Sequence, residues 1–139
     1  MYKSLGYHIE LRKGNLRTTQ LLYKTLRSRG YTYLYEKPSK ADVVFFRGTI
    51  RGSESRISHM GIVADVLKDG TVVIVHYGSK GVGEIRMNLS HPHAYKGKDG
   101  RIINDFLRKS ETGCSAGKWL SGELFSAFGN LYTYAEEQE

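Results

Sequence analysis

Cysteine is nearly absent from this chain: its 139 residues include a single one, Cys114. An intramolecular disulfide and a cysteine-rich zinc site are therefore both excluded. Long hydrophobic runs are absent too, since the longest falls far short of the ~20 apolar residues that cross a membrane. The first residues also lack the charged region and apolar run of a secretory signal. The chain as written thus predicts no membrane span and no export signal.

Acidic residues are in deficit. The chain has 14 Asp and Glu against 21 Lys and Arg, a net charge of +7, together with ten tyrosines. This balance would suit an anionic partner such as nucleic acid, lipid headgroups or an acidic wall polymer. The basic residues are scattered, however, and no usual nucleic-acid-binding signature is present. We expect a generally basic, solvated surface and disfavour a nucleic-acid partner.

The length predicts one domain over residues 1–139, large enough to bury roughly two thirds of the surface of its unfolded chain. Apolar residues recur at helical spacing in two segments, and β-branched or alternating apolar residues form four short runs. The predicted helices are 16–29 and 116–128, the predicted strands are 42–46, 58–66, 71–77 and 84–88, and the tail 131–139 is expected to fray.

Two histidines lie on neighbouring predicted strands, His59 near the start of one and His76 at the end of the next. Asp69-Gly70 between them is a strong hairpin signal. A tight turn at these two residues would place the histidines four residues apart, about 13 Å along the strand. A six-residue connection would instead place them directly opposite each other, within side-chain reach. The sequence leaves both registers open.

Other reactive side chains form weaker patterns. His91-Pro92-His93 is a compact pair without an obvious third ligand, so we predict surface histidines and no metal site. Three glycines in 78–83 match neither phosphate-binding motif, and no cofactor is predicted. Cys114 precedes the predicted last helix, whose dipole could lower its pKa, but nothing in the spacing brings it to His59, so we favour a small residue at a helix start.

The order of several motifs resembles the core of the NlpC-type peptidoglycan endopeptidases, which are papain-like cysteine peptidases of the bacterial envelope. The matching segments, within residues 2–88, are Arg17-Thr18-Thr19-Gln20, Asp42-Val43-Val44-Phe45-Phe46, Ser58-His59-Met60-Gly61-Ile62 and Ile74-Val75-His76. The resemblance implies an α+β, papain-like fold with a small antiparallel sheet. It also implies that His59 deprotonates the nucleophile and that His76 orients His59.

The chain departs from this family at the nucleophile. The family's cysteine lies in an Asp-Cys-Ser-Gly motif at the start of a helix before all these segments, and no cysteine precedes His59. Residues 2–6 resemble the end of that helix. Three interpretations stay open: a truncated family member, a degenerate domain without the nucleophile, or a permuted site in which Cys114 serves His59.

The resemblance implies hydrolysis of an amide bond in a peptidoglycan stem peptide through an acyl-enzyme. Its catalytic residues would be His59, His76 and, in a permuted site, Cys114. The wall peptide would be the partner, and the family is extracytoplasmic, although this chain carries no export signal and its location and oligomeric state stay open. The alternative is a non-catalytic module that binds wall peptide or nucleic acid through its basic surface.

Overall fold

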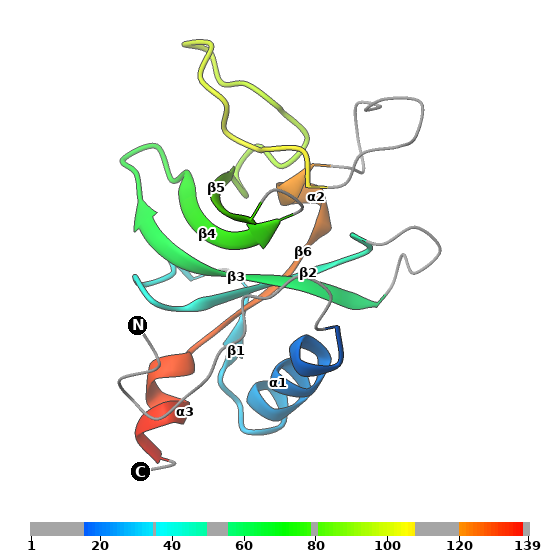
Figure 1. Cartoon of the computed structure of the whole chain (residues 1–139). Helices are drawn as coiled ribbons and strands as arrows, with labels where there is room; N and C mark the ends of the chain where they lie inside the picture. Colours follow the sequence, from blue (N-terminus) through cyan, green and yellow to red (C-terminus); the bar gives the residue numbers. More distant parts are fainter. Residues whose placement is uncertain (1–15, 35, 50–55, 79–80, 108–119, 138–139) are drawn as a thin grey trace.

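A computed structural model describes residues 16–34, 36–49, 56–78, 81–107 and 120–137. The six strands among these residues join one antiparallel sheet in the order β1-β6-β2-β3-β4-β5 (Figure 1). Along the chain the elements are α1 (Leu16–Ser28), β1 (Thr32–Tyr33), β2 (Val43–Arg47), β3 (Ile57–Val66), β4 (Val72–Gly78), β5 (Gly81–Met87), α2 (Ser121–Leu124), β6 (Phe125–Gly129) and α3 (Leu131–Glu137).

The predicted α+β, papain-like fold is wrong. The described chain is mainly a six-stranded antiparallel sheet with a few short helices. The error is largest at the predicted helix 116–128, where residues 121–124 form the single turn α2 and the chain then becomes strand β6. β6 lies between β1 and β2 and pairs with both, so these long-range pairings override the helical spacing of its apolar residues.

The other predicted elements are confirmed. α1 covers residues 16–28, and β2 to β5 each begin and end within three residues of the predicted bounds. The glycines at 81 and 83, predicted to lie in a loop between strands, belong to β5. The tail expected to fray contains α3, whose Leu131 and Ala135 are fully buried.

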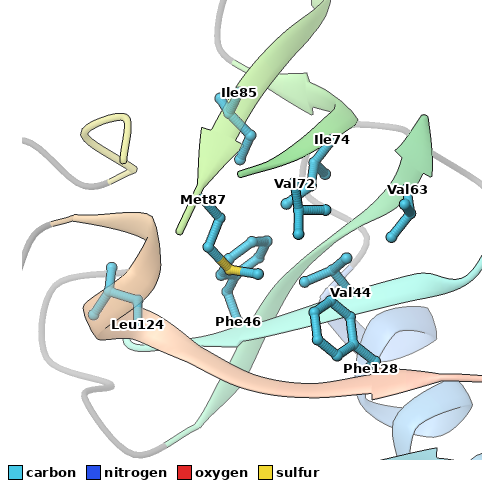
Figure 2. Packing of buried hydrophobic residues seen from close by; sticks show 9 residues of the cluster. All are labelled: Val44, Phe46, Val63, Val72, Ile74, Ile85, Met87, Leu124 and Phe128. Atoms are coloured by element: carbon cyan, nitrogen blue, oxygen red, sulfur yellow. The ribbon is translucent and has the colours of Figure 1, made fainter. Parts of the chain in front are cut away.

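Two hydrophobic cores lie on opposite faces of the sheet. On one face the sheet curls, and the side chains of β2 to β6 and α2 point toward one another (Figure 2). We call this group the inner core; it comprises Val44, Phe46, Val63, Val72, Ile74, Ile85, Met87, Leu124 and Phe128. Val44 and Phe46 alternate with Val43 and Phe45 along β2, so the four buried residues of this strand serve both faces.

α1 and α3 cover the other face (Figure 1). Leu26 of α1 is fully buried there, and the ring of Tyr23 meets Phe45 edge-on with centroids 5.2 Å apart. α1 ends at Ser28, and Gly30 beyond it has φ +76°, which lets the Tyr31 N–H donate back to the Leu26 carbonyl at 2.9 Å. This glycine-terminated helix end turns the chain toward β1.

The hairpin between β3 and β4 confirms the turn expected at Asp69-Gly70. The Leu67 N–H donates to the Thr71 carbonyl at 2.8 Å, and Gly70, with φ +89°, completes a three-residue loop. A bulge between Val63 and Asp65 then shifts the pairing by one residue. His76 therefore lies opposite Gly61, a register different from both that the sequence left open.

A long connection, residues 88–107, follows β5 and is fixed by the buried side chain of Asn104. Its amide nitrogen donates to the His91 and Ala94 carbonyls, each at 2.8 Å, and its oxygen accepts from the Asn88 N–H at 2.8 Å. The next residue, Asp105, bonds the backbone of β5 at Arg86. The connection is thereby attached to the end of β5.

A substitution at Gly61 tests how closely β3 and β4 approach each other. A Cβ atom at this position would lie 2.4 Å from Ile74 Cγ2 and 2.9 Å from the Val75 carbonyl oxygen. We expect Gly61→Ala to lower the free energy of unfolding by roughly 1–3 kcal/mol, as overpacking does. Chemical denaturation measures this loss. Gly83→Ala is the matched control, because its Cβ would meet nothing within 4 Å. Equal stability of the two variants would contradict the close approach of β3 and β4.

Candidate functional site

His59 and His76 project from the same face of the sheet as the inner core. His76 pairs with Gly61, and His59 lies two residues earlier on β3, so the two histidines are diagonal neighbours across the strands. Their side chains span this diagonal: His59 Nε2 and His76 Nδ1 are 2.8 Å apart, with the rings nearly perpendicular at 88°. The structure thus brings together the two residues that the resemblance assigns to one site.

Glycines leave room for this contact. Gly61 puts no side chain between the two histidines, and a Cβ there would lie 3.4 Å from that of His76. Gly78 lies beside the His76 ring, where a Cβ would be 3.2 Å from Cε1. A larger residue at position 78 would therefore press on the His76 ring.

Both imidazoles favour the neutral form. Burial, and to a lesser extent the neighbouring His76, lowers the pKa of His59 to about 4. Burial also lowers the pKa of His76, although the charge of Asp105 acts in the opposite direction. The His59 ring lies 6.1 Å from that of Phe46, a fully buried member of the inner core, which accounts for its poor access to water.

The hydrogen bond occupies Nε2 of His59, and the tautomer decides whether the remaining nitrogen, Nδ1, can act as a base. With His59 Nε2–H donating to His76 Nδ1, the lone pair of His59 Nδ1 is available to accept a proton. The imidazolium formed by that step keeps its hydrogen bond to His76. The pair therefore has the geometry of a general base with an orienting partner.

The third predicted site residue, Cys114, lies outside the described residues. His91 and His93 are both exposed, as predicted for surface histidines, and His93 bonds the Glu123 carboxylate at 2.7 Å. Within the described ranges, no three His, Cys, Asp or Glu residues are grouped as metal ligands would be.

Asp42, the acidic residue that opens the matching β2 segment, has a structural role. Its buried carboxylate accepts hydrogen bonds from the Tyr33 hydroxyl and from the Ser39 N–H, the latter at 3.1 Å. Burial and this carboxylate raise the pKa of Tyr33. Asp42 therefore joins β1 to the start of β2.

Sequence reasoning missed Asp105 and the spacing role of Gly61. Asp105 follows a buried asparagine in a segment whose type the sequence left undecided, and no motif marks it. Gly61 did have a sequence signal, because it is a glycine between the apolar residues Met60 and Ile62 of a predicted strand. Such a glycine is typical of a close backbone approach.

No helix among the described residues is long and apolar enough to span a membrane. Comparison of the chain with protein-family models, curated proteins and solved structures gives no match. The similarity to NlpC-type endopeptidases therefore rests on the sequence motifs, and the function has to be argued from the site itself.

The lowered pKa of His59 makes stability depend on pH. Between its ordinary pKa of 6.5 and the folded value of about 4, the unfolded chain binds more protons, so acid favours unfolding. We expect the free energy of unfolding to fall by roughly 2 kcal/mol between pH 7 and pH 5 on account of His59. Urea denaturation at the two pH values measures this loss.

His59→Gln, which keeps a polar side chain but does not titrate, should lose less stability over the same pH range. His91→Gln is the control, because His91 is exposed and should leave the wild-type pH dependence unchanged. A pH dependence that is the same in His59→Gln and wild type would contradict a buried, neutral His59.

Proposed function

We propose that this domain is a cysteine-type amide hydrolase in which His59 is the general base and His76 its positioning residue. The observation that carries the proposal is the hydrogen bond of 2.8 Å between His59 Nε2 and His76 Nδ1. Burial of His59 in its neutral form makes the domain less stable in acid. A catalytic role explains why such a pair would be kept.

The proposed reaction begins at His59 Nδ1, the ring nitrogen that does not bond His76. His59 Nδ1 takes the proton of a thiol, and the resulting thiolate attacks the carbonyl carbon of the substrate amide. The C–N bond breaks as the imidazolium returns the proton to the leaving amine, giving a thioester. Water, deprotonated by the same nitrogen, then hydrolyses the thioester to a carboxylic acid and restores the thiol.

Cys114 is the proposed nucleophile, because it is the single cysteine of the sequence. The neutral state of His59 favours transfer of the proton during attack over a preformed thiolate and imidazolium pair, since a pKa of about 4 disfavours the charged ring. The sequence motifs supply the substrate class, a peptidoglycan stem peptide. The papain-like architecture is not part of this proposal.

A stem-peptide electrophile that alkylates thiols tests the proposal. We expect stoichiometric labelling of Cys114 and hydrolysis of stem-peptide fragments, both abolished in Cys114→Ala. His59→Ala should slow labelling by about 100-fold or more, the usual contribution of a general base. His91→Ala should leave the labelling rate unchanged. Mass spectrometry follows labelling, and liquid chromatography follows the released peptides.

Iodoacetamide provides the internal comparison, because it reports the general reactivity of the thiol. A peptide electrophile that is no faster than iodoacetamide, or that reacts equally with wild type and His59→Ala, would overturn the enzymatic proposal. Binding of stem peptide without turnover would instead support the non-catalytic module. Circular dichroism of His59→Ala ensures that loss of labelling is not loss of fold.

A further inference from the structure

A second candidate site lies on the opposite face of the sheet. There α1 and the start of β3 border an open hollow of about 690 Å³. We call it the basic hollow; it is lined by Gln20, Tyr23, Lys24, Arg27, Ser28, Arg56 and Ile57. Its volume falls within the roughly 300–1,000 Å³ typical of pockets for small ligands. His59 and His76 project from the other face, so the hollow is separate from their site.

Three permanent cations converge on this hollow. Lys24 and Arg27 lie one turn apart on α1, and Arg56 comes from the residue before β3. All three side chains are exposed, and in the part of the chain that the structure describes none of them forms an ion pair. None of the lining residues is acidic, so the three like charges that border the hollow repel one another and an anion bound between them would relieve this repulsion.

The rest of the lining favours an organic anion over a bare ion. Tyr23 and Ile57 are partly buried and pack against the core beneath α1, so they give the hollow an apolar wall. Gln20 adds a side-chain amide that can donate or accept. A ligand that combines two negative charges with an apolar or ring-shaped part would contact both the cations and the apolar wall.

We propose that the basic hollow binds a small organic phosphate, a monoester or diphosphate with at least two negative charges. Guanidinium groups match phosphate oxygens through paired N–H donors, and the lysine adds a point charge. A carboxylate carries one charge and would leave two of the three cations unneutralised. The net charge of +7 further attracts such anions toward the domain.

Calorimetry with phenyl phosphate as the probe tests the proposal. We expect binding that weakens as salt is added, and about tenfold weaker binding of benzoate, which has the same ring but one charge. Diphenyl phosphate, a singly charged diester, should also bind at least about tenfold more weakly. Equal binding of the diester would overturn the dianion specificity and point to a phosphodiester polymer instead.

Paired charge variants locate the site. Lys24→Gln with Arg27→Gln should weaken phenyl phosphate binding by about tenfold or more, because each removes a charge-assisted contact. Lys37→Gln with Lys40→Gln removes the same charge from exposed residues outside the hollow and should change binding by less than about twofold. Equal effects of the two pairs, or no binding at all, would overturn the proposal.

Stability provides an independent measurement. Phenyl phosphate should raise the Tm of wild type and of the Lys37/Lys40 pair, but not that of the Lys24/Arg27 pair. All four exchanged side chains are exposed, so the variants should retain the wild-type Tm in the absence of phosphate. A rise in Tm that is the same in all three proteins would mean general anion stabilisation and would also overturn the site.

Discussion

The register between β3 and β4 is the constraint on which most of this structure depends. It is determined by a three-residue loop and one bulge between Val63 and Asp65. Because side chains alternate between the faces of a sheet, a slip of one residue would move His76 away from the face of His59. The same slip would move Val72 and Ile74 out of the inner core. Stability and the histidine pair thus require the same alignment, so selection for either one maintains both.

Polar side chains fix the parts of the domain that strand pairing leaves free. Asn104 is fully buried and uses both its amide nitrogen and its oxygen to hold the turns of residues 88–107. That anchor places Asp105 against Arg86, where its charge partly offsets the effect of burial on His76. A residue far from both histidines in sequence therefore contributes to the protonation of their pair.

Local patterns predicted much of this fold. The helical spacing of α1, its glycine end and the apolar runs of β2 to β5 each follow from a few adjacent residues. The sequence could not reveal β6, because Phe128 and its neighbours have helical spacing and become a strand only by pairing with β2 and β1. Nor could it choose the histidine register, since a bulge has no reliable sequence signal. The basic hollow could not be predicted either, because its cations are separated in the sequence and are brought together only where α1 packs beside the start of β3.

The two edges of the sheet differ in what they offer to another chain. At one edge β1 is only two residues long, and Tyr33 is held by Asp42. At the other edge, near the end of β5, Asp105 forms hydrogen bonds with both the backbone N–H and the carbonyl of Arg86. Among the described strands, residues 81–84 are therefore the place where an incoming strand would find open backbone groups. Two glycines and the charge of Glu84 make this stretch a poor template for edge-to-edge pairing.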